Sequence, residues 1–488
     1  VVYDSLLVQR RSALHEQVAL AMESLYADRL PEHFELLAFH FNHSADTQKA
    51  LQYLERAGGK AARVFALGEA RRHYRAAVER LREGGTTEEL SRRIDLTLKW
   101  AAVSFYVPSR ALLDALEAAR ADAIALKDDD RVALTTFWAG TIHYALGNPE
   151  QALARLQACR ELPGAARNAN VQAMSLNYLG RVCFYLVDFE NSMAHFEVGI
   201  PLLEGLGLDV EVANSLGMLA IAHAFRGEFK EAEDRSQEVF RIAERIDNPV
   251  ARSVGHVSRA IAAVVKGAWA EAVQPADAAR DLARRIGNSI MEGTAVWANG
   301  YATAMLGGLE EGLALMHQGI GLIESTESQL GLSAFYSRLA LIYAERGYCE
   351  ESASAAERAL ELVGIGGDRL GEHTAYAAQA LLAAQEHPPR WKAAGDAMGK
   401  ALRLAGERGM RPDLASLELL HARMLCQQGE PAAAGEQLNR ARAAFAELGM
   451  DGRLAEADRL AADPAPACAA PRRADGRTSA RKPSGEAS

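Results

Sequence analysis

The chain has 488 residues, which is too long for one ordinary compact core, so several domains or a repeat array are expected. Its formal net charge is -10, from 54 Lys and Arg residues against 64 Asp and Glu residues, and this excludes a general nucleic-acid binder because phosphate affinity comes from clustered basic side chains. No uninterrupted apolar run reaches the roughly 18 residues that a membrane span needs.

The five cysteines are odd in number, scattered, and never spaced as CxxC. They fit free thiols in a reducing cytosol better than disulfides or a zinc site, so a cytoplasmic location is expected. The chain opens at Val1, inside an apolar and helix-like phrase, with no recognisable signal peptide. We therefore expect it to be the C-terminal part of a longer protein.

The first 83 residues alternate helix and turn. Residues 1–30 show an apolar helical face, and Pro31 is suited to the first turn of a new helix that continues to about residue 44. Asp46 is placed to cap the helix that follows, and Gly58 and Gly59 predict its end. Residues 67–83 then form another predicted helix.

From about residue 90 the sequence repeats with a period of 40 residues. Turn positions recur at Gly147, Val187, Gly227, Gly267, Gly307 and Gly347, and after an insertion at residues 387–389 they continue at Pro389 and Gly429. A glycine there can take the positive φ that a helix end favours. Fixed-period self-similarity of this kind defines a repeat protein.

Three columns of mostly small residues accompany the turns. Seven residues before the turn stand Gly140, Gly180, Ala220, Ala260, Gly300, Ala340 and Ala422. Five and twelve residues after it stand Ala152, Ser192, Ala232, Ala272, Gly312, Ser352, Ala394 and Ala434, then Cys159, Gly199, Val239, Ala279, Gly319, Ala359, Ala401 and Ala441. Small side chains on both helices of a pair let their backbones approach closely, and stacked pairs bury apolar area that one pair cannot bury alone.

These patterns predict an all-α, right-handed superhelical solenoid of helix pairs. Its expected organisation is a helical joint with the first helix pairs over 1–83, a repeat array over 84–462 that ends in a covering helix near 451–461, and a tail over 463–488. The tail is rich in Pro, Ala, Gly, Ser and Arg with almost no large apolar residue, so it is predicted to be disordered.

Helix pairs with paired small residues resemble tetratricopeptide (TPR) repeats, although the TPR unit is shorter, about 34 residues. The longer form resembles the arrays attached to bacterial signalling ATPases of the STAND type and to transcription activators of the maltose-regulator kind. The first 80 or so residues are similar to the joint between the ATPase module and the TPR tail of bacterial class III adenylate/guanylate cyclases. That similarity rests on Tyr3-Asp4-Ser5-Leu6-Leu7, Arg10-Arg11, Leu14-His15, Leu36-Leu37-Ala38-Phe39-His40-Phe41 and Tyr53-Leu54-Glu55-Arg56-Ala57-Gly58.

A search for catalytic and cofactor motifs finds no candidate. Gly58-Gly59-Lys60-Ala61 lacks the first glycine and the hydroxyl of a phosphate loop, and His15-Glu16 lacks the second histidine of HExxH. His33, His40 and His43 lie on one predicted helix, but no acidic residue or cysteine nearby completes a metal site. We expect no enzyme, no cofactor and no metal in this chain; the resemblance implies that any cyclase or ATPase activity belongs to domains upstream.

The first helices of TPR-like pairs line a concave face, which is the best candidate for a binding site. Projecting that geometry onto the chain selects a partner-binding groove formed by Phe137, Tyr144, Asn177, Arg181, Trp297 and Tyr301. Such a groove can hold an extended peptide or a helix. The alternative is that these aromatic side chains only pack adjacent repeats, as aromatic stripes at helical spacing usually do.

The resulting hypothesis is a non-catalytic sensor and protein-interaction module. It would bind a protein or peptide partner on the concave face and regulate a nucleotide cyclase or ATPase domain in cis, without contacting nucleic acid or membrane. Two alternatives stay open, a free-standing TPR adaptor and the repeat region of a STAND-type transcription activator.

Overall fold

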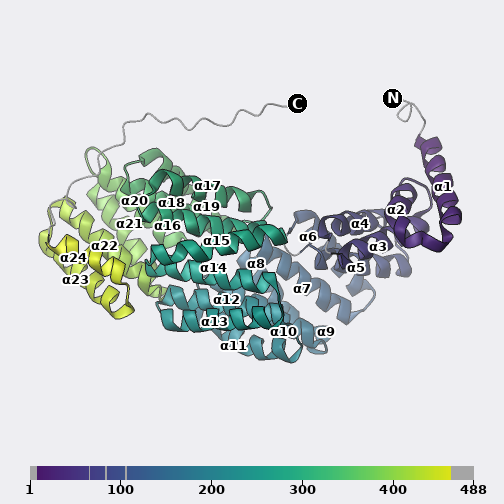
Figure 1. The fold of residues 1–488 in the computed structure, drawn as a ribbon, viewed down its shortest axis with the longest axis horizontal. Helices are drawn as coiled ribbons and strands as arrows, with labels where there is room; N and C mark the ends of the chain where they lie inside the picture. Colours follow the sequence, from purple (N-terminus) through teal and green to yellow (C-terminus); the bar gives the residue numbers. More distant parts are fainter. Residues whose placement is uncertain (1–7, 65, 83–84, 105–106, 463–488) are drawn as a thin grey trace. The chain divides into compact units, whose positions relative to one another are not determined.

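The computed structural model of the chain describes residues 8–64, 66–82, 85–104 and 107–462 (Figure 1). All regular secondary structure in these ranges is helical. The 3-10 helix η1 (Ala27–His33) lies between the first two α-helices. Residues 463–488, predicted to be a disordered tail, and residues 3–7 of the cyclase-like joint lie outside the described ranges.

The α-helices follow one another in antiparallel pairs, as the repeat predicts. In chain order they are α1 (Val8–Leu25), α2 (Phe34–Asn42), α3 (Thr47–Arg63), α4 (Leu67–Arg80), α5 (Thr87–Ala102), α6 (Arg110–Ala125), α7 (Asp129–Ala145), α8 (Pro149–Arg160), α9 (Pro163–Ala166), α10 (Ala169–Tyr185), α11 (Phe189–Gly205), α12 (Asp209–Arg226), α13 (Phe229–Arg245), α14 (Pro249–Lys266), α15 (Trp269–Ile286), α16 (Ser289–Met305), α17 (Leu309–Glu324), α18 (Leu332–Glu345), α19 (Cys349–Gly366), α20 (Glu372–Gln385), α21 (Trp391–Glu407), α22 (Arg411–Gln428), α23 (Pro431–Leu448) and α24 (Asp451–Ala462).

Contacts divide the chain into two units. The N-terminal unit comprises residues 1–183, 194–212 and 324–330, and the C-terminal unit comprises residues 184–193, 213–323 and 331–488. Each unit has its own apolar core between successive helix pairs. The predicted boundary near residue 83 falls inside the N-terminal unit, where α4 packs against α5.

The predicted turns have the backbone conformation that the period requires. Positive φ angles occur at Gly147 (82°), Val187 (60°), Gly227 (84°), Gly267 (77°), Gly307 (105°), Gly347 (79°) and Gly429 (87°). At each of these residues the chain leaves the first helix of a pair in the left-handed backbone conformation, which glycine adopts without steric cost. Seven of the eight predicted turns therefore have this conformation, including Val187, which is not a glycine. Pro389 does not have it, although it does lie in the connection between α20 and α21.

The three columns of mostly small residues are buried throughout. In the pair α16–α17 the contact is between backbones, because a Cβ atom on Gly300 would lie 2.7 Å from the carbonyl oxygen of Gly312. A Cβ atom on Gly319 would likewise lie 2.6 Å from the carbonyl oxygen of Gly293. These residues serve packing, as predicted.

Local predictions in the first 83 residues hold in one place and fail in two. The side chain of Asp46 accepts a hydrogen bond from the backbone N–H of Lys49 and caps α3. Gly58 does not end that helix, which continues through it to Arg63. A glycine stands there for another reason: a side chain at this position would collide with the ring of Tyr74. Pro31 does not open α2 either; it lies inside η1, and α2 begins at Phe34.

The covering helix predicted near 451–461 is α24 (Asp451–Ala462). Ala457 and Leu460 are its buried residues, and they join the apolar cluster of α22 and α23. Its exposed positions hold charged residues, glycine and alanine with no large apolar side chain, so the helix closes the apolar end of the array in the C-terminal unit.

Candidate functional site

Four of the six predicted groove residues are buried in the N-terminal unit. The rings of Phe137 and Tyr144 stand edge to face with that of Tyr178, with centroids 5.9 and 5.7 Å away. Glu211 accepts hydrogen bonds from Asn177 Nδ2 and Arg181, each at 3.1 Å. These contacts match the alternative interpretation, in which the side chains pack adjacent helices.

The other two predicted residues lie on α16 in the C-terminal unit. Trp297 is 2 % exposed and is stacked between the rings of Tyr301 and Phe335, at centroid distances of 5.4 and 4.2 Å. Tyr301 is partly exposed and also lines a cavity. Partner binding by the six residues stays a prediction, and Tyr301 is the member that the structure places on a large cavity.

That cavity, here called the lumen, has a volume of about 990 Å³ and lies within the C-terminal unit. Its wall is formed by α14, α16, α18, α20, α22 and α24, together with Trp269 at the start of α15. These are the first helices of successive pairs and the covering helix. A cavity of this size matches pockets that enclose small ligands, which have about 300–1,000 Å³.

The lumen wall follows one column of the repeat. Tyr301, Leu341, Leu381 and Arg423 all line it, and each stands at the same place in its helix, six residues before the turn or before the insertion. Arg181 occupies this column in the N-terminal unit. Tyr301 is among the predicted groove residues and Arg423 is not, although the same column, continued past the insertion, contains Arg423.

A buried charged triad forms one part of the wall. Arg338 donates hydrogen bonds to both carboxylate oxygens of Asp413, at 3.1 and 3.3 Å, and Nε2 of His373 lies 3.2 Å from the same carboxylate. Burial alone would raise the pKa of Asp413, but Arg338 and His373 outweigh burial and hold that pKa well below its usual range. Nδ1 of His373 is buried without a hydrogen-bond partner.

A second charged network joins α24 to the wall. Arg453 donates to Glu456 at 2.6 Å, and Arg423 pairs with both Glu456 and Glu345. The guanidinium of Arg453 also lies 5.9 Å from the ring centroid of Trp269, within cation–π range. Burial raises the pKa of Glu345, against the opposing effect of Arg423.

The lumen carries an excess of positive charge. Among the described residues its lining includes Arg338, Arg346, Arg423, Arg453 and Arg459 against Asp413, Glu345 and Glu456. Arg346 and Arg459 are exposed and form no ion pair with a described carboxylate. With an apolar wall that includes Leu341, Leu420 and Met424, the lumen suits a ligand that has both apolar and anionic groups.

The N-terminal unit has a cleft of about 590 Å³ formed by residues of α2, α3, α4 and α5. It is lined by Phe34, Gln52, Glu55, Arg56, Gly59, Arg63, Tyr74, Arg92 and Lys99. We call it the basic cleft, because it holds four cationic side chains and one carboxylate.

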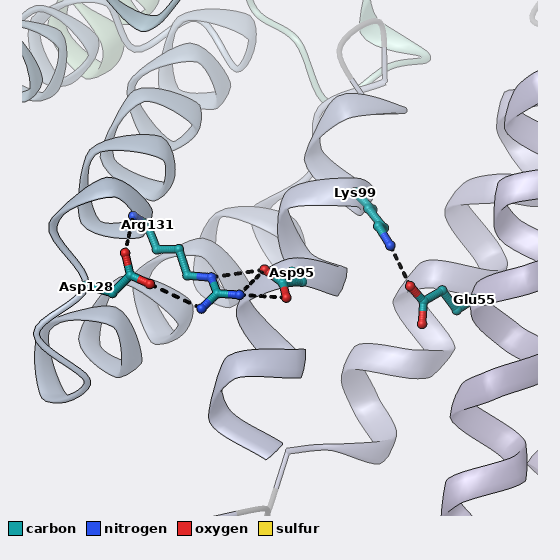
Figure 2. Close-up of polar contacts among 5 residues, drawn as sticks. All are labelled: Glu55, Asp95, Lys99, Asp128 and Arg131. Atoms are coloured by element: carbon teal, nitrogen blue, oxygen red, sulfur yellow. Dashed lines mark hydrogen bonds and ion pairs between the residues drawn. The ribbon is translucent and has the colours of Figure 1, made fainter. Parts of the chain in front are cut away.

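Beside the basic cleft, ion pairs connect neighbouring helices (Figure 2). Lys99 of α5 reaches Glu55 of α3, and Arg131 of α7 makes three hydrogen bonds of 2.7 to 3.0 Å with Asp95 of α5. Asp128, at the start of α7, accepts further bonds from Arg131. Glu55, Asp95 and Asp128 are thus each paired with a neighbouring cation.

The histidines considered for metal binding do not all contact one another. Nδ1 of His15 lies 2.9 Å from Nδ1 of His40, and its ring stacks on His43, whereas His33 packs on Tyr26. Burial, with the neighbouring imidazoles, lowers the pKa of both His15 and His40. Over the part of the chain that the structure describes, no group of three or more His, Cys, Asp or Glu side chains could hold a metal ion.

Cys159 and Cys349 carry free thiols. No helix among the described residues is both long and apolar enough to cross a bilayer.

Comparison with known proteins gives the fold. No known protein family matches the sequence, and no curated protein matches it. Among solved structures, a Rap protein complexed with competence and sporulation factor matches with a TM-score of 0.55 and 14% identity over 75% of this chain and 99% of that chain. The quorum sensor NprR from B. thuringiensis matches with a TM-score of 0.44 and 13% identity over 74% of this chain and 99% of its own.

A STAND protein with a tetratricopeptide repeat sensor from Pyrococcus horikoshii matches with a TM-score of 0.38 and 11% identity, over 85% of this chain and 74% of that one. The Rap match, at this low identity, shows the fold alone, and we draw nothing from the two weaker ones. The chain is an all-α superhelical solenoid of TPR-like helix pairs, and the predicted fold class is confirmed.

Proposed function

We propose that this chain is a non-catalytic sensor module that binds a peptide in the lumen of the C-terminal unit. The observation that carries the proposal is the lumen itself, with about 990 Å³ of space, an apolar wall and more guanidinium groups than carboxylates. The Rap protein of the same fold is complexed with competence and sporulation factor, which supports a small protein or peptide partner here.

The residues suggest how a peptide would be held. A carboxylate of the peptide would meet Arg346 and Arg459, which form no ion pair with a carboxylate of the described residues. The apolar side chains of the peptide would pack on Leu341 and Leu420.

Binding there would join helices that are far apart in sequence. A ligand that contacts α18, α22 and α24 together stabilises the arrangement in which all three surround it. We propose that this ordering is the signal, and that it acts on an upstream nucleotide-using domain, a cyclase or STAND-type ATPase in the cytoplasm of a bacterium. The support for that part is the resemblance of about the first 80 residues to the joint of such proteins.

An array of short synthetic peptides with free C-terminal carboxylates tests the lumen. Ser416 lines the lumen and is partly exposed, so Ser416→Trp places an indole in the space while leaving the core intact. We expect a small set of peptides to be retained by the wild-type chain and lost by this variant.

The matched control is Ala432→Trp on the exposed surface of α23, which should retain the same peptides. Circular dichroism establishes that both variants are folded. If Ser416→Trp kept every peptide that the wild type binds, the lumen would not be the site.

A further inference from the structure

We propose that the basic cleft of the N-terminal unit is a second binding site, one that takes an acidic segment of a partner protein. This site is separate from the lumen and does not depend on the function proposed for it. The first observation is a local reversal of charge. The chain carries a net charge of -10, yet Arg56, Arg63, Arg92 and Lys99 gather around a single carboxylate, Glu55.

Two of these charges are available for a partner. Glu55 forms ion pairs with Arg92, at 3.6 Å, and with Lys99, so its negative charge is neutralised within the cleft. Arg56 and Arg63 are exposed, and neither forms an ion pair with a carboxylate of the described residues. An incoming carboxylate therefore gains two guanidinium partners without displacing an existing ion pair.

Aromatic rings give the cleft shape and hold one of the arginines in place. The guanidinium of Arg56 lies 5.6 Å from the ring centroids of Phe34 and Tyr53. Such cation–π contacts orient a guanidinium while its N–H groups can still donate. The side-chain oxygen of Gln52 accepts from two of these nitrogens, at 2.9 and 3.3 Å, so the guanidinium is held by a neutral group and keeps its charge unpaired. Burial raises the pKa of Tyr74, which keeps its phenol neutral at the cleft wall. Phe34 and Tyr74 can then contact apolar side chains between the acidic residues of the partner.

The surroundings favour an acidic protein segment over a nucleic acid. The surface next to the basic cleft shares Glu55, Arg92 and Lys99 with it but adds Asp95 and no further cation. A nucleic acid presents a charge at every phosphate and needs a continuous basic track. The unpaired positive charges, on Arg56 and Arg63, lie in the basic cleft and not in this neighbouring surface. This arrangement fits a partner segment with a few carboxylates separated by apolar residues.

Fluorescence anisotropy on the full chain tests the proposal. The probe is a short fluorescein-labelled peptide of alternating Glu and Leu, and an oligothymidylate of equal charge is measured in parallel. We expect saturable peptide binding that weakens as salt is added, because the cleft is exposed to solvent. Arg56→Glu and Arg63→Glu should each weaken it by about tenfold, since each removes a charge-assisted contact and adds repulsion.

Arg72→Glu is the matched control. Arg72 lies on α4 outside the cleft, its side chain is 75% exposed, and its substitution changes the net charge equally. It should leave the peptide affinity within about twofold, as expected for a rim charge remote from the contact. An equal loss in Arg72→Glu, tighter binding of the oligothymidylate, or no measurable peptide binding would each overturn the proposal. A Ser416→Trp variant should bind this peptide normally, which separates the cleft from the lumen.

Discussion

The buried pair in the wall of the lumen and the exposed cations of the basic cleft use charged residues in opposite ways. In the lumen, Arg338 and Asp413 have side chains 13% and 10% exposed and are paired with one another. In the cleft, Lys99 and Glu55 are 46% and 34% exposed, and Arg56 and Arg63 have no carboxylate partner among the described residues. A buried pair must be satisfied within the fold, whereas an exposed cation can stay available to a partner. The same residue types therefore stabilise the fold where they are buried and paired, and stay available for recognition where they are exposed.

The largest test of this difference removes one partner of the buried pair. Arg338→Met leaves Asp413 charged and buried, and should lower the free energy of unfolding by about 3–5 kcal/mol. Urea denaturation measures the change. Arg63→Met in the cleft is the matched substitution and should change stability by no more than about 0.5 kcal/mol. Equal losses in the two variants would mean that burial does not separate the two regions.

The pH dependence of stability tests a second buried carboxylate of the C-terminal unit. Asp368 is 1% exposed and accepts hydrogen bonds from the backbone N–H groups of Ser333 and Leu370. Burial nevertheless raises its pKa from 3.8 to about 6, so the fold favours the protonated form.

The contribution of Asp368 to the free energy of unfolding is therefore fully present below about pH 4 and is lost as the pH rises through 6. Relative to Asp368→Asn, the wild type should lose up to about 3 kcal/mol between pH 4 and pH 7, at about 1.4 kcal/mol per unit of pKa shift. Urea titrations at several pH values measure this difference. Parallel curves for the two proteins would contradict it.

Glycine substitutions compare how tightly the two units pack. A Cβ atom on Gly300 would meet backbone, the carbonyl oxygen of Gly312 at 2.7 Å, and we expect Gly300→Ala to cost about 1–3 kcal/mol. In the N-terminal unit, Gly58→Ala should cost less because the atom it meets, at 2.8 Å, belongs to the ring of Tyr74, which can shift.

Gly399→Ala is the control, since Gly399 lies in α21 with open space around it. It should raise the free energy of unfolding by about 0.5–1 kcal/mol through helix propensity alone. Thermal or urea denaturation ranks the three variants. A loss at Gly58 larger than that at Gly300 would reverse the proposed order.

The smallest expected effect lies at an exposed ion pair. Lys99→Met removes the pair with Glu55 and should change the free energy of unfolding by less than about 1 kcal/mol, because both side chains are solvated. High salt should abolish even that difference. A loss as large as that of Arg338→Met would show that the cleft depends on its ion pairs for folding.

Most of the fold could be predicted because each helix pair depends on local rules. A residue with positive φ every 40 residues ends the first helix, and mostly small residues at three positions allow the second to pack against it. The same local reasoning failed at Gly58, where the reason for a glycine is a ring on the next helix and not a helix end. Five of the six side chains selected for the groove are buried, and their role in partner binding stays a prediction.

The sequence by itself determined the period, the turns and the buried columns, because these depend on residues close together in the chain. Only the tertiary structure decided which first-helix residues face a cavity. Trp297 and Tyr301 are one helical turn apart, yet Trp297 is covered by the ring of Phe335, whereas Tyr301 lines the lumen. Arg338 and Asp413 are 75 residues apart and meet only because successive pairs curve around the lumen. The curvature of a repeat array is the sum of small rotations between successive repeats, so it cannot be predicted from any single repeat.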